Sequence, residues 1–235
     1  MKKKNKLIII FIACLFVAIY SIQKIVQNKR LQNEGVELYE SIRAIAIEEQ
    51  GYINHALLSE INSDYVAWLN ITDSSISYPV VQTTNNNFYL THGFDKNYLI
   101  AGSIFIDCYA AGNFSNRNTV IYGHQMPDET MFSELRYFMN DEFCETHQEV
   151  ILYTENEVLT YAIFSVYRID AVEDYFISVI EQQNITDEWI EDKILNSRYE
   201  FSINVDITSA QVITLITCTE NGNETDRYVV HAVLF

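Results

Sequence analysis

The 235-residue sequence is poor in basic residues, and this shortage excludes whole classes of partner. It has 15 Lys and Arg against 32 Asp and Glu, and residues 1–30 hold seven of the basic residues and no acidic one. The remainder of the chain therefore carries eight basic residues and a net charge of −24. Nucleic acids and anionic membrane surfaces attract Lys/Arg-rich proteins, so we expect neither as a partner and attribute the negative charge to solubility.

One apolar run stands near the N-terminus, where residues 7–22 contain no charged side chain and basic residues flank both ends. At about 1.5 Å per residue, the run covers most of a hydrocarbon core of roughly 30 Å, and Ile25 and Val26 can extend it. A cleavable signal peptide is the alternative, but Tyr20, Gln23 and Lys24 occupy the place where a cleavage site needs small residues. We favour an uncleaved anchor with the N-terminal lysines in the cytoplasm and the bulk of the chain outside.

Cysteine is also scarce. Cys14 lies inside the apolar run, so only Cys108, Cys144 and Cys218 remain for the exported part, and none forms a CxxC pair. An odd, unclustered set is not a disulfide scaffold, and at least one thiol should stay free. No spacing of His, Cys and carboxylates suggests a zinc site, so we expect no metal and no cofactor. A free exported thiol favours a catalytic explanation.

The chain has only two prolines, and it contains no Pro-rich linker or internal repeat. Residues 32–60 have apolar positions at helical spacing and predict one or two packing helices without a chemical role. Two helical insertions are expected further on: a short one at 131–139, and amphipathic stretches in 174–196, the second opened by Thr186 or Asp187 as N-cap. Beyond Trp68, short β-branched and aromatic runs predict a closed or nearly closed β-barrel. These runs are 77–82, 103–107, 119–123, 149–154, 158–169, 211–217 and 228–235.

The run Thr214-Leu215-Ile216-Thr217-Cys218 is a hydrophobic strand that ends in a cysteine and continues into a polar loop. A cysteine at a strand end combines exposure with a rigid backbone, which suits a nucleophile. Arg227, nine residues later on a strand expected to pair with this one, can favour the thiolate and stabilise an oxyanion. Taken singly, a strand cysteine is more commonly a small buried hydrophobe, and such an arginine a surface residue.

His124 ends another strand-like run, directly after Gly123. Histidine can serve as general acid and general base because its unperturbed pKa lies near neutrality, although a loop histidine without a role is the simpler alternative. The other histidines are His55, His92, His147 and His231, and we expect His231 to be a half-buried residue of the last strand.

Together, the TLITC strand, the following Arg227 and the upstream Tyr122-Gly123-His124 resemble the sortase family. The signature of that family is a TLxTC strand, an arginine on the next strand and a histidine after an earlier one. The resemblance spans nearly all of the chain beyond the N-terminal region, from Trp68-Leu69 to Arg227-Tyr228-Val229-Val230, and looks most like class B. One departure is Ile216, where class B members commonly have serine, so no substrate contact of that serine is carried over.

Class B resemblance implies a mixed α+β fold, namely an eight-stranded β-barrel with N-terminal helices and a helix between the sixth and seventh strands. The chain would divide into a cytoplasmic tail (1–6), a transmembrane anchor (7–26), a helical extension (27–66) and a catalytic barrel (67–235). The residues implied to be catalytic are Cys218 as nucleophile, His124 as acid and base, and Arg227 as oxyanion partner.

The implied reaction is cysteine transpeptidation in a Gram-positive envelope. An exported protein would be cleaved after Thr in a C-terminal sorting pentapeptide of the NPxTN or PxTG type, and joined through a thioacyl enzyme to a peptidoglycan amine. The alternatives are a sortase-fold peptidase that mainly hydrolyses and a non-catalytic cell-wall binding module. The intact Cys-His-Arg set disfavours the latter.

Overall fold

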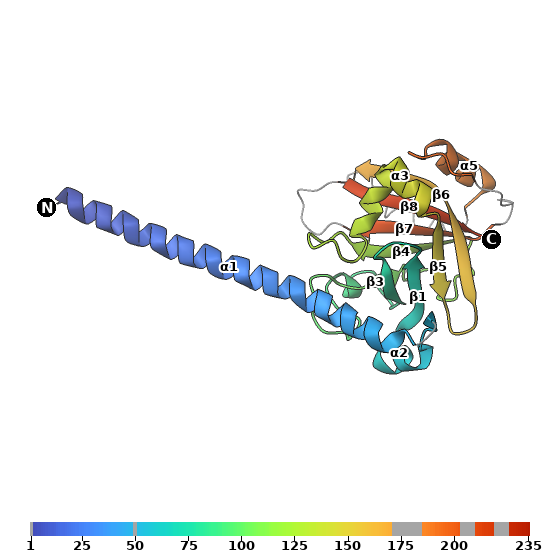
Figure 1. Ribbon diagram of the computed structural model, residues 1–235, viewed down its shortest axis with the longest axis horizontal. Helices are drawn as coiled ribbons and strands as arrows, with labels where there is room; N and C mark the ends of the chain where they lie inside the picture. The colour runs from blue at the N-terminus through green and yellow to red at the C-terminus, as the bar shows by residue number, and fades with distance from the viewer. Residues whose placement is uncertain (1, 49–50, 171–184, 203–209, 219–225) are drawn as a thin grey trace.

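The computed structural model describes residues 2–48, 51–170, 185–202, 210–218 and 226–235 (Figure 1). Eight strands form a closed barrel in the order β1-β2-β3-β4-β7-β8-β6-β5, which confirms the predicted fold. The pairs β2–β3 and β4–β7 are parallel, and all other neighbours in the barrel are antiparallel. The strands are β1 Tyr65–Ile71, β2 Ser77–Val81, β3 Ile104–Ile106, β4 Asn118–His124, β5 Glu149–Tyr153, β6 Val158–Asp170, β7 Val212–Cys218 and β8 Asp226–Leu234.

Helices precede the barrel and interrupt its strands. Their bounds are α1 Lys2–Ala46, α2 His55–Ile61, η2 Phe88–Leu90, η3 Ser133–Met139, α3 Asp141–Thr146 and α5 Asp187–Leu195, with η2 and η3 being 3₁₀ helices. The insertion predicted at 131–139 is thus η3, and α5 confirms the second stretch of the other insertion. Thr186 is the N-cap of α5, accepting a hydrogen bond from the Trp189 backbone N–H at 3.3 Å. Residues 174–184 of that prediction lie outside the described residues.

Helix α1 runs without a break from the apolar run into the first of the predicted packing helices (Figure 1). Residues 20–35 contain no proline and a single glycine, so nothing in them interrupts the helical hydrogen bonds. The apolar side chains of its first half are exposed, whereas Tyr39, Ile42 and Ala46 are buried against the barrel. From Ile8 onward, α1 is long and apolar enough to cross a membrane, a test that an N-terminal signal sequence also passes.

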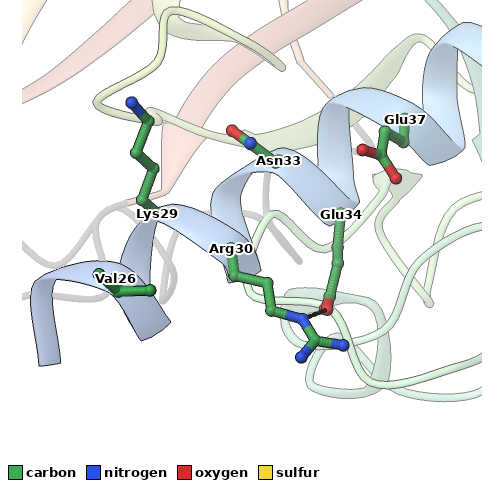
Figure 2. Close-up of a pocket in the computed structure, with 6 residues that line it drawn as sticks. All are labelled: Val26, Lys29, Arg30, Asn33, Glu34 and Glu37. Atoms are coloured by element: carbon green, nitrogen blue, oxygen red, sulfur yellow. Dashed lines mark hydrogen bonds and ion pairs between the residues drawn. The ribbon is translucent and has the colours of Figure 1, made fainter. Parts of the chain in front are cut away.

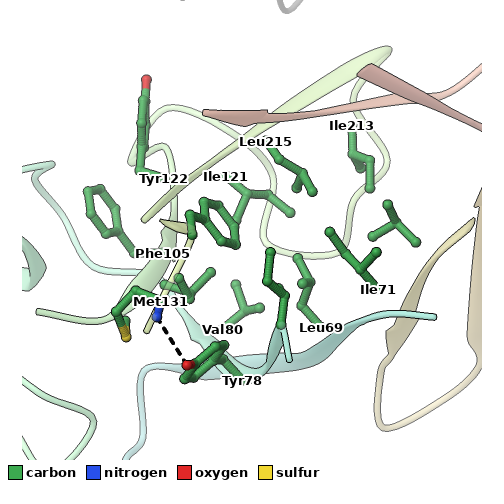
Figure 3. Packing of buried hydrophobic residues seen from close by; sticks show 14 of the residues in the cluster. Leu69, Ile71, Tyr78, Val80, Phe105, Ile121, Tyr122, Met131, Ile213 and Leu215 are labelled. Atoms are coloured by element: carbon green, nitrogen blue, oxygen red, sulfur yellow. Dashed lines mark hydrogen bonds between the residues drawn. The ribbon is translucent and has the colours of Figure 1, made fainter. Parts of the chain in front are cut away.

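Apolar side chains fill the barrel interior, as Figure 3 shows for Leu69, Val80, Ile121 and Leu215. All seven residues of β4 are buried, and so is every residue of β7 from Val212 to Thr217. A strand covered on both faces has near-continuous apolar sequence, which is why these two runs stand out in the chain. The two buried parallel strands carry the candidate site at their carboxyl ends.

Candidate active site

The parallel pair β4–β7 brings two of the predicted catalytic residues together. The strands pair residue by residue from Asn118↔Val212 to His124↔Cys218. The α-carbons of His124 and Cys218 are therefore cross-strand partners, although 94 positions separate them in the chain. Because parallel strands end at the same edge of a sheet, both residues lie at one end of the barrel.

Arg227 is the second residue of β8, which pairs with β7 on the side opposite β4. The antiparallel pairing of these strands includes Ile216↔Val229, and continuing that register by two residues brings Arg227 level with Cys218. The half-buried Arg227 guanidinium donates from Nη1 to the Thr217 carbonyl at 2.9 Å, and the Tyr228 backbone N–H donates to Thr217 Oγ1 at 3.0 Å. Thr217 thus fixes both the strand and the side chain beside the cysteine. The sequence did not indicate this role of Thr217, because it depends on a main-chain carbonyl, which every residue type has.

His124 is held in place from two directions. The residue is only 4% exposed, and its Nε2 lies 2.6 Å from the Leu90 carbonyl oxygen. A carbonyl can only accept, so Nε2 carries the hydrogen in this arrangement and Nδ1 is the nitrogen that can take up a proton. The His124 carbonyl in turn accepts from the Phe132 backbone N–H at 2.9 Å. Neither partner is visible in a sequence pattern, because both are main-chain groups of distant segments.

Gly123 explains the residue that precedes the histidine. A Cβ at this position would lie 2.5 Å from Ile104 Cδ1 and 2.6 Å from Phe132 Cγ. Only glycine lets the Phe132 ring pack against the end of β4, and this packing places the Phe132 N–H at the His124 carbonyl.

A buried series of side-chain hydrogen bonds crosses four strands, on the amino-terminal side of His124 in β4 and of Cys218 in β7. Thr214 Oγ1 donates to Asn118 Oδ1 at 2.9 Å and lies 2.8 Å from His231 Nδ1, while His231 Nε2 lies 2.8 Å from the Tyr167 hydroxyl. Because the Thr214 hydrogen is used on Asn118, His231 Nδ1 must donate and Nε2 must accept. The series takes one residue each from β4, β7, β8 and β6, and so ties together the strands that bear the candidate residues.

His231 is therefore fully buried, and the expectation of a half-buried strand residue was wrong. Helix α5 covers this part of the sheet and packs Trp189 edge-to-face on the imidazole, a tertiary contact that alternation along one strand does not indicate. Burial lowers the pKa of His231 to about 3, helped by the positive charge of Lys193. The ring is neutral at physiological pH and is no candidate for acid–base chemistry.

The other two thiols outside α1, Cys108 and Cys144, lie in surroundings that do not suit a nucleophile. Cys144 is fully buried, its Sγ donates to the Phe138 carbonyl at 3.1 Å, and burial raises the pKa of the thiol to about 11. Burial and the neighbouring Asp107 also raise the pKa of Cys108. The thiolate is disfavoured at both positions, so Cys218 remains the candidate nucleophile.

The side chains of the remaining histidines have local partners: His55 Nδ1 meets the Tyr65 hydroxyl, and His92 and His147 meet main-chain carbonyls. Across the described part of the chain, no group of three His, Cys, Asp or Glu side chains could hold a metal ion.

A hollow of about 420 Å³ lies along α1 and is lined by side chains between Val26 and Glu37, with Arg30 paired to Glu34 (Figure 2). It includes none of the three candidate residues.

Comparison with known proteins gives consistent matches. The family model for the sortase domain matches residues 69–235. Sortase B of Listeria monocytogenes is 33% identical over 181 residues, covering 75% of this chain and 72% of that protein. Sortase B of Staphylococcus aureus is 27% identical over 238 residues, covering 98% and 96%. The crystal structure of Clostridium perfringens sortase B has a TM-score of 0.69 and 31% identity, covering 77% of this chain and 98% of that one.

Proposed function

The chain belongs to the sortase family, and on that premise we propose that it is a class B-like transpeptidase that joins exported proteins to peptidoglycan amines. The observation that carries the proposal is the pairing of His124 with Cys218 at the ends of two buried parallel strands. A nucleophile and an acid–base group on rigid strands are held close with little freedom, as acyl transfer requires.

In the first step, the Cys218 thiolate attacks the carbonyl carbon of the Thr in a sorting pentapeptide of the NPxTN or PxTG type. The negative charge that develops on the carbonyl oxygen is stabilised by Arg227, whose guanidinium the Thr217 carbonyl holds. The C–N bond then breaks, His124 gives the departing amine the proton that its Nδ1 took from the Cys218 thiol, and the acyl group stays on sulfur as a thioester.

In the second step, a peptidoglycan amine attacks the thioester and His124 accepts its proton. The C–S bond breaks, Cys218 leaves as thiolate, and a new amide joins the exported protein to the wall. Water in place of the amine gives hydrolysis with the same residues.

We assign helix α1 as the membrane anchor, with the N-terminus in the cytoplasm and the barrel outside. The exposed apolar first half of α1 supports this assignment, and so does the cluster of lysines before it. The location suits an enzyme whose donor is an exported protein and whose acceptor is the wall.

The test is product analysis with the full chain in detergent micelles. Peptides carrying NPxTN- or PxTG-type motifs are incubated with and without triglycine as the amine, and the products are identified by mass spectrometry. We expect cleavage after Thr and an amide-linked product when the amine is present, and neither with Cys218→Ala. If cleavage gives only the free acid even at saturating amine, the enzyme is a hydrolase and the proposed transfer is wrong. No cleavage of any peptide in the panel would refute the proposal.

A further inference from the structure

We propose that Tyr39 of α1 is a positioning residue for His124, so that the helix leading out of the apolar run is part of the acid–base apparatus. The inference rests on the proposed function, because its kinetic test measures that transpeptidase activity. It gives the N-terminal region a role that the sequence did not indicate, where the predicted helices had only a packing function.

The first link joins α1 to a loop 63 positions away in the chain. The Tyr39 side chain is 4% exposed, and its hydroxyl donates to the Gly102 carbonyl at 2.6 Å. The same hydroxyl lies 3.0 Å from Ser103 Oγ, which donates to the His92 carbonyl at 2.9 Å. Close packing of Gly35 against Ala101 brings α1 onto the same loop, since a Cβ at Gly35 would be 3.2 Å from Ala101 Cβ.

The second link joins that loop to the imidazole. Ser103 donates its backbone N–H to the Tyr89 carbonyl at 2.9 Å, and the next carbonyl, that of Leu90, binds His124 Nε2. Gly102 has a φ of +57°, and a Cβ there would lie 2.8 Å from the Leu90 oxygen and 3.1 Å from His124 Cδ2. Even one added carbon at Gly102 would thus press on both the imidazole and the carbonyl that binds it, so the loop has little room on this side of His124. We therefore expect a shift of Gly102 to disturb the position of the imidazole.

A third link reaches His124 from its main-chain side. The Tyr39 ring packs edge-to-face on Tyr78 with centroids 5.3 Å apart, and the Tyr78 hydroxyl accepts from the Met131 backbone N–H at 3.0 Å (Figure 3). Met131 precedes Phe132, whose N–H binds the His124 carbonyl. Both groups that fix His124 are thus connected to Tyr39 within a few contacts.

The packing of α1 on the barrel is incomplete beside Tyr39. A hollow of about 280 Å³ lies between α1 and the barrel and is lined by Tyr39, Arg43 and Tyr78 among others. The two polar contacts of the Tyr39 hydroxyl therefore add to the loop's own hydrogen bonds in fixing the position of the loop relative to α1. A variant that removes only this oxygen should therefore disturb the histidine.

The kinetic test compares Tyr39→Phe with the matched control Tyr161→Phe in the full chain in detergent micelles. The Tyr161 hydroxyl is buried and has no hydrogen-bond partner among the described residues. Tyr161→Phe therefore removes the same atom as Tyr39→Phe but breaks none of the hydrogen bonds seen in the structure. We expect kcat to fall about 10-fold for Tyr39→Phe with KM within twofold, since misplacement of a catalytic group by about 1 Å can cost about 10²-fold. Tyr161→Phe should keep wild-type kcat.

The second readout is the ¹⁵N spectrum of the His124 imidazole, which reports the ring nitrogen that carries the proton. Wild type should show the Nε2-protonated form, and Tyr39→Phe a mixture. If wild type neither cleaves nor transfers, the proposed function fails while this spectrum still decides the inference. Should Tyr39→Phe not fold, Ser103→Ala, which removes the neighbouring contact, is expected to change the spectrum in the same direction. A folded Tyr39→Phe with an unchanged spectrum and kcat within twofold of wild type overturns the inference.

Discussion

The three cysteines outside α1 differ in their surroundings: Cys218 pairs with His124, whereas burial raises the pKa of Cys108 and Cys144. We therefore expect only one of them to be essential. Cys218→Ala removes the nucleophile and should abolish cleavage while the chain stays folded. Cys108→Ala and Cys144→Ala should keep activity, because the thiolate is disfavoured at both positions. Peptide cleavage and circular dichroism of the three variants are the measurements. A folded but inactive Cys144→Ala alongside a cleaving Cys218→Ala would reverse the assignment.

Arg227 is predicted to act through geometry as well as charge. Its guanidinium donates to the Thr217 carbonyl and presents further planar donors, whereas a lysine ammonium is a point charge. Arg227→Lys should therefore be nearly as damaging as Arg227→Ala, each lowering kcat by about 10²–10³-fold with little change in melting temperature. The measurement is kcat/KM on a fluorogenic pentapeptide. An Arg227→Lys enzyme within about threefold of wild type would show that positive charge alone suffices.

His231 predicts a pH dependence of stability. Its pKa is about 3 in the folded chain and about 6.5 when unfolded, so between these values only the unfolded chain binds the proton. The stability that His231 contributes is therefore complete above about pH 6.5 and declines as the pH falls towards 3, by at most about 1.4 kcal/mol per pH unit. His231→Gln should be less stable than wild type at pH 7.5, with a gap that narrows at pH 4.5. A gap independent of pH in thermal melts would contradict the buried neutral imidazole.

At the scale of elements, the end of β4 depends on glycine. Gly123→Ala would place a methyl group within 2.6 Å of both Ile104 and the Phe132 ring, and such overpacking costs about 1–3 kcal/mol. We expect a lower melting temperature and reduced kcat, because Phe132 also fixes His124. Gly112→Ala is the matched control, since its Cβ would clash with the end of the Gln82 side chain at 2.6 Å and meet Val66 only at an ordinary contact distance of 3.7 Å. If both variants lowered kcat equally, the predicted link from Gly123 through Phe132 to His124 would be wrong.

Sequence patterns predicted the strands that are buried along their whole length. They missed short elements whose position depends on contacts with distant parts of the chain. The runs of β4 and β7 are buried along their length, so continuous apolar sequence identified them. Strand β1 was not among the predicted runs, since β1 begins before the change of texture near Trp68. Helix α3 is only six residues long, too short for helical periodicity to show, and its one buried residue is Cys144.

The same contrast holds for the site. His124, Cys218 and Arg227 each end or begin a strand-like run, and this position in the sequence singled them out. The register that places His124 beside Cys218 depends on pairing across the barrel, which no local pattern contains. The partners that orient the site are main-chain carbonyls of Leu90 and Thr217, and any residue type can supply them.

At the scale of the whole molecule, the apolar half of α1 predicts membrane association. The full chain should fractionate with membranes, and a double variant Leu15→Arg, Phe16→Arg should be released, because each arginine at the centre of a span costs about 2.5–3.5 kcal/mol. Fractionation followed by intact mass measurement tests this. A soluble secreted species trimmed near Tyr20 would show a signal peptide in place of the anchor.

The central claim is that three strands bring Cys218, His124 and Arg227 together for acyl transfer. Its most direct test is the covalent intermediate, trapped by acid quench after the full chain is mixed with a sorting peptide in the absence of amine. Peptide mapping by mass spectrometry then locates the acyl group. The account predicts a thioester on Cys218 in wild type that disappears when amine is added, and none in Cys218→Ala. Turnover of the peptide with the acyl group on another residue, or with Cys218→Ala as active as wild type, would contradict it.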